Sequence, residues 1–327
     1  HDAVPGPEPP AGSPGGPFHH DAPGPAAVPA PPAARPGPGP GPGRRRRSVR
    51  PDPAYLGYRA GSAVSRALPS FVLGPVEAAL GHLGPRLMAD RAAQVARHQQ
   101  RVRPDLAGAD LDRAVRHVFE SYAAYWLESF RLPGTSPAAL EAGITVDGYE
   151  HVEAALAQGE GAILALPHLG GWEWAAFWMT RCRGAAVTAV AEPVEPPELA
   201  AWFVGLREAL GMEVIPLGPE AGAGSVRALA ANRVLALVCD RDIGGGGVEV
   251  EFFGERTTLP GGPATLALRT GAALIPAAVY LEDGHHHGVA LPPLDATRRG
   301  RLREDVTRLT QELAHLHEDL IRRAPEQ

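Results

Sequence analysis

The chain has 327 residues, of which 44% are hydrophobic, so it can bury the core of one large domain or of two ordinary ones. The formal net charge is -6 and all 31 basic residues are arginine, and this acidic balance argues against a nucleic-acid partner. No uncharged apolar run reaches the roughly 18 residues that span a bilayer, so any membrane contact is expected to be peripheral.

Residues 1–50 differ in composition from the rest of the chain. They contain 15 Pro and 9 Gly, almost no large apolar residues and no helical or alternating pattern, which predicts a disordered, partly polyproline tail. Four arginines at residues 44–47 are consistent with a solvated linker or with weak attraction to anionic lipid head groups. The folded part is predicted over residues 51–327, with a helical N-terminal part at 51–140 and an α/β core at 141–327.

The N-terminal part is predicted to be helical but interrupted. Residues 55–102 contain Pro69, Pro75 and Pro85, and they carry more apolar surface than one stripe of a short helix needs. This surface packs on the main domain, lies at a membrane interface, or does both. Residues 111–132 predict a longer amphipathic helix, near whose end Glu128 and Arg131 are spaced for a surface ion pair.

Beyond residue 143 the apolar pattern alternates between strands and helices. This alternation predicts an α/β fold with a mainly parallel or mixed central sheet flanked by helices. The predicted strands are 144–146, 162–166, 186–191, 213–216, 234–238, 248–253 and 274–281, and the predicted helices are 149–158, 172–182, 197–210, 225–232, one from about residue 262, and 301–323.

Several histidines lie outside the main pattern. His285, His286 and His287 follow Asp283-Gly284, and we predict an exposed hairpin turn rather than a metal site, since no other ligands are signalled nearby. His315 and His317 on the last helix are predicted to lie at the surface.

Residues 166–174 combine a strand end, a tight turn and a helix start. Pro167 ends the strand because it has no N–H to donate, and the strand's carboxyl end is where α/β sheets bind ligands. His168 is expected at this edge and Glu173 in the first helical turn. The carboxylate could then reach back to the imidazole, fix its tautomer and leave one nitrogen as a general base. A purely structural role for the two residues is the alternative.

The sequence Asp240-Arg241-Asp242 follows the predicted strand 234–238, so it arrives at the same edge of the sheet as His168. Arg241 could bind a phosphate there. It could equally pair with Asp240 and Asp242 in a structural role.

Four separated blocks in this order resemble a known family: His168-Leu169-Gly170-Gly171-Trp172-Glu173-Trp174, Asp240-Arg241-Asp242, residues 247–254 and residues 259–264. Together they are similar to the bacterial lipid A acyltransferase superfamily, and within it to the actinobacterial phosphatidylinositol mannoside acyltransferases. The resemblance covers roughly residues 54–327.

The resemblance implies a reaction. His168 would take the proton from a mannose hydroxyl of a phosphatidylinositol mannoside, and the oxygen would attack the thioester of a long-chain acyl-CoA. Glu173 would orient the imidazole, and the amides of Gly170 to Trp172 are candidate donors to the oxyanion. Because a thioester is already activated, we expect no metal and no cofactor, with acyl-CoA as a substrate.

The resemblance also suggests substrate-binding residues and a location. Glu192 and Arg207 are similar to positions that line the acceptor and acyl-CoA groove, and Arg241 is a further candidate for phosphate. We expect a peripheral enzyme at the cytoplasmic face of the cell membrane, in contact with anionic lipid. The alternatives are another lipid acceptor (lipid A-like or a lysophospholipid), a thioesterase-like hydrolase, and a non-catalytic membrane-surface module.

Overall fold

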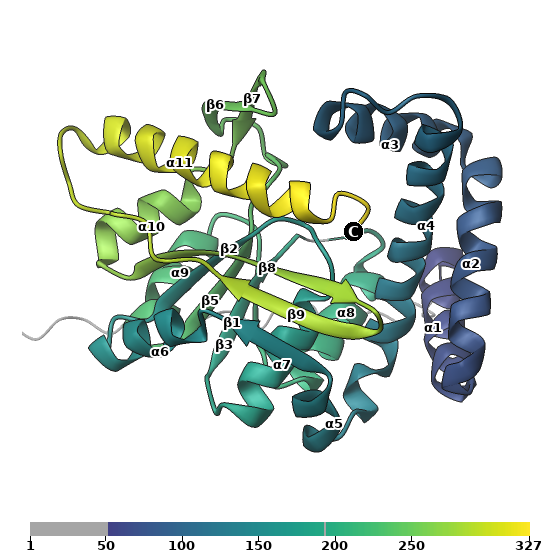
Figure 1. Cartoon of the computed structure of the whole chain (residues 1–327). Coiled ribbons are helices and arrows are strands. Elements are labelled where there is room, and N and C mark those ends of the chain that lie inside the picture. The colour runs from purple at the N-terminus through teal and green to yellow at the C-terminus, as the bar shows by residue number, and fades with distance from the viewer. Residues whose placement is uncertain (1–51, 193) are drawn as a thin grey trace, which may run out of the picture. The chain divides into compact units, whose positions relative to one another are not determined.

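The computed structural model describes residues 52–192 and 194–327. The predicted tail at residues 1–50 lies outside this part of the chain. The N-terminal helices are α1 (Pro53–Ala67), α2 (Ser70–Leu87), α3 (Ala89–Val102), α4 (Gly108–Arg131) and α5 (Pro137–Ala142), with a 3₁₀ turn η1 (Leu132–Gly134) before α5. Helices α1 to α4 lie side by side at the right of Figure 1.

Helix α2 does not break where prolines were expected to break it. The interruption falls at Pro69, between α1 and α2, whereas Pro75 and Pro85 lie inside α2. Packing against α4 outweighs the hydrogen bonds that these prolines remove. The two helices approach closely, since a Cβ added at Gly81 or Gly84 would collide with the side chains of Glu120 and Phe119 on α4.

The α/β prediction is confirmed. A seven-stranded sheet has the order β1-β9-β8-β2-β5-β3-β4. Its strands are β1 (Ile144–Asp147), β2 (Ala162–Leu166), β3 (Val187–Ala191), β4 (Glu213–Pro216), β5 (Val234–Val238), β8 (Ala273–Glu282) and β9 (His285–Ala290). Strands β8, β2, β5, β3 and β4 are parallel, β9 is antiparallel to β8, and β1 is parallel to β9.

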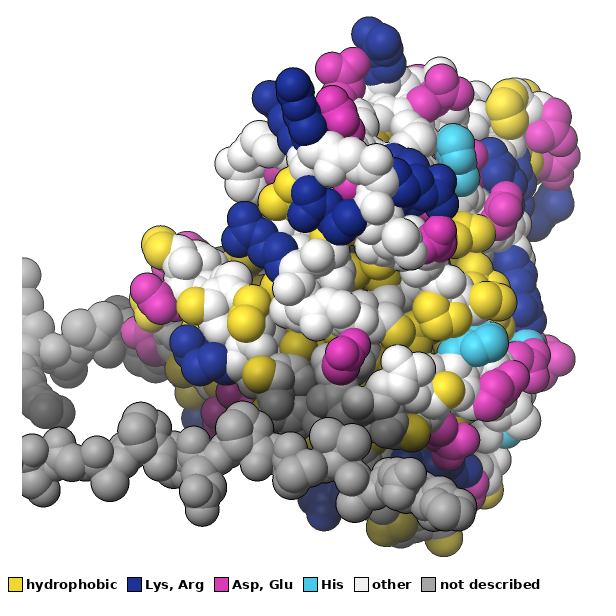
Figure 2. Space-filling view, turned by 90° about the vertical axis from the view of Figure 1, so that its left-hand side faces the viewer, with side chains coloured by type: hydrophobic (Ala, Val, Ile, Leu, Met, Phe, Trp, Pro, Cys, Tyr) yellow, Lys and Arg dark blue, Asp and Glu magenta, His cyan; other side chains and the backbone are white. Residues whose placement is uncertain are grey.

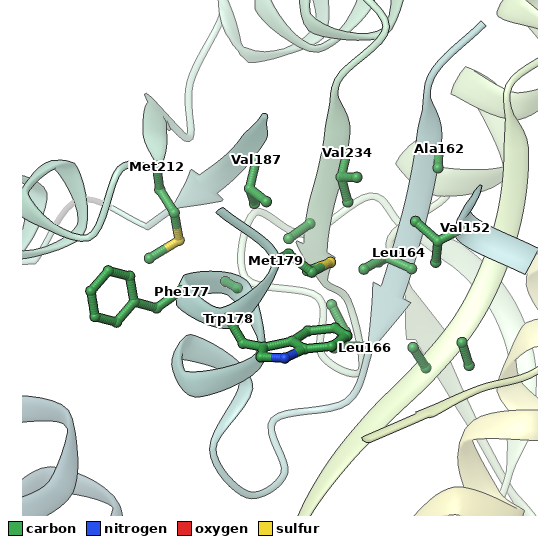
Figure 3. Packing of buried hydrophobic residues seen from close by; sticks show 14 of the residues in the cluster. Val152, Ala162, Leu164, Leu166, Phe177, Trp178, Met179, Val187, Met212 and Val234 are labelled. Atoms are coloured by element: carbon green, nitrogen blue, oxygen red, sulfur yellow. The ribbon is translucent and has the colours of Figure 1, made fainter. Parts of the chain in front are cut away.

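Helices cover both faces of the sheet in Figure 1. The core helices are α6 (Tyr149–Gln158), α7 (Trp172–Cys182), α8 (Pro197–Ala209), α9 (Ala221–Ala230), α10 (Gly262–Thr270) and α11 (Leu302–Arg323). Side chains of β2 alternate between the faces, as period-2 geometry requires. Leu164 and Leu166 pack with Trp178 of α7 (Figure 3), whereas Ile163 packs with Leu313 of α11 on the opposite side.

Two strands were not predicted as such. Residues 255–259 form β7 (Glu255–Leu259), which pairs with β6 (Val248–Phe252) in a separate antiparallel hairpin. The three adjacent histidines begin strand β9, because the turn itself is made by Asp283 and Gly284, both with positive φ. The predicted hairpin is therefore confirmed, but the prediction that its histidines lie in an exposed turn is wrong, since His286 is only 1% exposed.

His317 also differs from expectation, since it is fully buried on the inner side of α11. Its Nε2 lies 3.2 Å from the carbonyl oxygen of Ala165 in β2. The predicted Glu128–Arg131 ion pair does not form either. Arg131 donates instead to the carbonyl oxygens of Ser65 and Leu68, at 2.5 and 2.7 Å, and so ties α4 to the end of α1.

Charged side chains of both signs are mixed over the face shown in Figure 2, with hydrophobic side chains visible between them. Several large apolar side chains are exposed on α1 and α2, including Phe71 at 82% and Leu87 at 79% exposure, and others are exposed on α4, on α9 and in loops. Among the described residues, every helix is too short or too polar to cross a bilayer.

Candidate active site

His168 and Asp240 extend from neighbouring parallel strands. Leu166 of β2 lies opposite Val238 of β5, and the Cys239 N–H donates to the Leu166 carbonyl at 2.9 Å. Two residues further along each strand, His168 Nδ1 lies 2.5 Å from Asp240 Oδ1. The strand register alone thus brings this imidazole and this carboxylate together.

The two partners differ in exposure. The side chain of His168 is 44% exposed and that of Asp240 only 19%. Burial alone would raise the pKa of Asp240, but the hydrogen bond and charge of His168 outweigh it and hold this pKa below its ordinary value. An ionised Asp240 that accepts from Nδ1–H leaves the Nε2 of His168 as the basic nitrogen.

Glu173 does not occupy the place predicted for it. Among the described residues no hydrogen bond or ion pair joins it to His168, so the expected contact between them is wrong. Its Oε1 instead accepts from the hydroxyl of Tyr125 at 2.8 Å and from the guanidinium of Arg207 at 3.0 Å. As the second residue of α7, Glu173 thus connects this helix with α4 and α8.

Tyr125, Glu173 and Arg207 form what we call the buried acidic network. Glu173 is 5% exposed. Its Oε2 and the Nε of Arg207 are both buried without a hydrogen-bond partner in the described structure. Burial first, and then the charge of Glu173, raise the pKa of Tyr125 well above its ordinary value. The guanidinium of Arg207 also lies over the ring of Trp172, 5.3 Å from its centroid.

A large cavity opens at the His168–Asp240 pair. Its volume is about 2270 Å³, and its walls come from α1, α3, α4, α8, α9, α10 and the loops after β2, β3 and β5. The predicted site residues that line it are His168, Gly170, Trp172, Glu192, Arg207 and Arg241. Glu173 is not in its wall.

Aromatic side chains form one apolar part of the cavity wall. Tyr58, Trp126 and Phe203 all line it, and their ring centroids lie 5.3 to 5.4 Å apart. Of the aromatic residues of α7, Trp172 reaches the cavity, whereas Phe177 and Trp178 are buried in the core below the sheet.

The cavity also carries positive charge. Arg241 pairs with Glu192 at 3.0 Å, and not with Asp240 or Asp242, which was one of the two alternatives for it. Asp242 accepts instead from the amides of the loop that follows, at Gly245 and Gly247. Arg227 of α9 and Arg269 of α10 also line the cavity, and neither has an acidic partner in the described part of the chain.

The turn between β2 and α7 presents backbone amides beside His168. Gly170 has φ of +54°, and a Cβ there would collide with the carbonyl of Val279, so only glycine fits. Within the described residues, no side chain caps α7 at Gly171. The first amides of the helix are therefore available to a developing negative charge.

Comparisons with known proteins identify the family of this chain. The family described as bacterial lipid A biosynthesis acyltransferase matches residues 48–327. The chain belongs to this family. A phosphatidylinositol mannoside acyltransferase of Mycolicibacterium smegmatis is 40% identical over 264 residues, which are 79% of this chain and 84% of the relative. One of Mycobacterium tuberculosis is 38% identical over 276 residues, which are 82% and 84%.

Family membership makes the protein an acyltransferase and confirms the predicted resemblance. Sequence reasoning placed His168 at the cavity together with five other residues of its wall, but it missed two partners. Asp240 was noted at the correct edge of the sheet without being paired to His168. Tyr125 lies within the predicted helix at residues 111–132, and nothing in its local sequence predicts a contact with Glu173. Among the described residues, no group of three or more His, Cys, Asp or Glu side chains could hold a metal ion.

Proposed function

We propose that this acyltransferase moves a long-chain acyl group from acyl-CoA to a mannose hydroxyl of a phosphatidylinositol mannoside, with His168 as the general base. The observation that carries the proposal is the His168–Asp240 pair at the opening of the large cavity. The name shared by the two relatives supports the acceptor.

The chemistry needs one base and one oxyanion site. His168 Nε2 takes the proton of the hydroxyl as its oxygen bonds to the thioester carbonyl carbon, and Asp240 stabilises the imidazolium. Amides between Gly170 and Trp172 are placed to stabilise the tetrahedral oxyanion. When the carbon–sulfur bond breaks, the imidazolium returns the proton to the thiolate, and the products are an ester and free CoA. We assign the role expected of Glu173 to Asp240.

The size and lining of the cavity suit two substrates. Pockets for one drug-sized ligand commonly measure about 300–1,000 Å³, whereas this cavity measures about 2270 Å³. The aromatic wall at Tyr58, Trp126 and Phe203 fits an acyl chain. Arg227 and Arg269, which lack acidic partners in the described structure, fit the phosphates of a CoA donor.

Exposed apolar side chains on α1 and α2 support contact with a membrane that holds the acceptor. Phe71, Leu83, Leu87 and Met88 are each more than half exposed, and Ala54 and Tyr58 of α1 also line the cavity. An apolar helix surface of this kind is typical of proteins that lie in the interface plane. We propose a peripheral position at the cytoplasmic face.

The test measures free CoA thiol released from palmitoyl-CoA, with and without phosphatidylinositol mannoside in anionic vesicles. We expect acceptor-dependent release by the wild type, a loss of about 10²–10⁴-fold in His168→Ala, and unchanged release in His117→Ala, a control at an exposed position on α4. In the same vesicles, the double substitution Phe71→Ser/Leu87→Ser should reduce the fraction of protein that sediments.

Each other outcome is decisive. Release that ignores the acceptor would identify a hydrolase instead. Normal release by His168→Ala would remove His168 as the base, and the absence of release by the wild type would overturn the proposed pair of substrates.

A further inference from the structure

His286 is a buried histidine directly behind the active-site turn. It lies on β9 with 1% of its surface exposed, and its N–H donates to the carbonyl of Gly143 at 2.9 Å. Its ring stacks on Trp174 of α7, with centroids 4.5 Å apart and planes at 26°. Burial of an ionisable ring is costly without a partner, so the contacts of its nitrogens matter.

The partner of His286 comes from the N-terminal helices. Its Nε2 lies 3.0 Å from Oε1 of Glu128 on α4. The contact does not have the geometry of a hydrogen bond, and neither Nε2 nor Nδ1 of His286 has a hydrogen-bond partner in the described structure. Because α4 also carries Tyr125 and Trp126 into the cavity, His286 contacts the helix that forms one cavity wall.

The same ring explains the second glycine of the active-site turn. Gly171 has φ of -99°, outside the left-handed region, so its backbone does not require glycine. A Cβ at this position would however lie 2.5 Å from Cε1 and 2.9 Å from Nδ1 of His286. Gly171 is glycine because the imidazole occupies that space.

The turn that carries His168 is therefore held from two sides. The Val279 carbonyl of β8 contacts Gly170, and the His286 ring of β9 contacts Gly171. The amides proposed to bind the oxyanion belong to this turn, between the two contacts. A shift of the ring would move them relative to His168 Nε2.

We propose that His286, held by Glu128 and Trp174, is a positioning residue that sets the place of the His168–Gly171 turn and thereby the rate of acyl transfer. This inference rests on the proposed function for its kinetic readout. A residue that only fills space would explain the packing but not the carboxylate of Glu128 that faces the ring.

The first experiment separates positioning from substrate binding. His286→Ala should lower kcat by up to about 10²-fold, because misplacement on the order of 1 Å costs that much, while KM for palmitoyl-CoA stays within about twofold. Glu128→Gln should lower kcat in the same direction by less. His285→Ala is the matched control, since this neighbouring histidine makes no side-chain hydrogen bond or ion pair in the described structure, and its kcat should not change.

The second experiment tests the contact itself by compensation. Gly171→Ala should lower kcat because the new methyl group collides with the ring. In the double substitution Gly171→Ala/His286→Ala the methyl group has room, so kcat should be higher than in Gly171→Ala alone. Additive losses in the two single variants and the double variant would overturn the inference.

An activity-independent measurement separates this inference from the proposed substrates. With ¹⁵N-labelled histidine, the ring Nδ1 resonance of His168 reports its hydrogen bond to Asp240, and it can be assigned with His168→Gln. It should move in Gly171→Ala and return toward the wild-type position in the double substitution. If it stays fixed in all variants, His286 does not position the turn, whatever the substrates prove to be. If it moves but no variant transfers acyl groups, the proposed substrates are wrong and the positioning stands.

Discussion

Two carboxylates, those of Asp240 and Glu173, lie near the turn between β2 and α7, and they make different contacts. Asp240 reaches His168 from the neighbouring strand and lies at a cavity that substrates can enter. Glu173 lies only five residues after His168 in sequence, yet it is buried on the other side of the turn between Tyr125 and Arg207. Asp240 contacts the imidazole of His168, and Glu173 joins α7 to α4 and α8.

The difference shows that proximity in sequence is a poor guide to which acid contacts His168. Glu173 lies in the first turn of α7, and there its carboxylate contacts Tyr125 of α4 and Arg207 of α8. A residue 72 positions away becomes the partner because parallel strands place it there. Sheet register brings Asp240 to the imidazole, whereas the nearby acid, Glu173, contacts side chains of two helices.

The largest expected effect contrasts the two acids directly. Asp240→Asn should lower kcat by about 10²–10⁴-fold, because an amide no longer enforces the tautomer with a free Nε2 or stabilises the imidazolium. Glu173→Gln should reduce kcat far less but lower the free energy of unfolding by about 3 kcal/mol, since Arg207 loses its buried counter-charge. Steady-state kinetics and urea unfolding of both variants measure the contrast.

The reverse pattern would refute this division of roles. A large loss of kcat in Glu173→Gln at unchanged stability, together with a small loss in Asp240→Asn, would restore Glu173 as the acid that assists His168. Urea unfolding of Asp240→Asn guards against a kinetic loss that merely reflects misfolding.

A smaller effect tests how far the buried acidic network stabilises the helices. Tyr125→Phe removes the hydroxyl that donates to Glu173, which should lower the free energy of unfolding by about 2 kcal/mol, as for other hydrogen bonds to charged groups. Because the pKa of Tyr125 is raised well above its ordinary value, the loss should be constant through the neutral pH range. Urea unfolding at several pH values gives the comparison.

Tyr122→Phe is the matched control on the same helix. The side chain of Tyr122 is exposed, and its hydroxyl makes no hydrogen bond in the described structure. Its loss should stay within about 0.5 kcal/mol. Equal losses in the two variants would mean that the network adds no stability beyond ordinary packing.

Much of the fold follows from local pattern. The bounds predicted for β2, α6, α7, β4 and β5 agree with the structure, because each is a periodic apolar run ended by Gly, Pro or a polar turn. Strand β9 was not predicted because its buried positions are His286, Gly288 and Ala290. These residues do not give the alternation of large apolar and polar side chains that indicates a strand. Helix α9 begins four residues earlier than predicted, within a segment rich in Ala and Gly.

The site was harder to predict than the fold. His168 could be placed at the sheet edge from its strand, its proline and its glycines. Its partner could not, because β5 lies next to β2 only in the folded sheet, and no local pattern specifies that order or the register. The ring of His286 against Gly171 likewise joins two segments far apart in sequence.

The smallest expected effect is on the pH dependence of stability, and it comes from the buried His317. Burial lowers the pKa of His317, although the Ala165 carbonyl and the charge of Asp240 act in the opposite direction. A lowered folded-state pKa means that the unfolded chain binds the proton more readily, so the stabilisation is complete above the ordinary value of about 6.5. It is lost as pH falls through the folded pKa, and acidification should therefore destabilise the protein in this range.

His317→Gln keeps an amide donor for the Ala165 carbonyl but does not titrate, so the free energy of unfolding should fall less steeply below about pH 6.5. The matched control is His315→Gln, at an exposed position on the same helix, which should keep the wild-type slope. An unchanged slope in His317→Gln would show that His317 is as easily protonated in the folded chain as in the unfolded one.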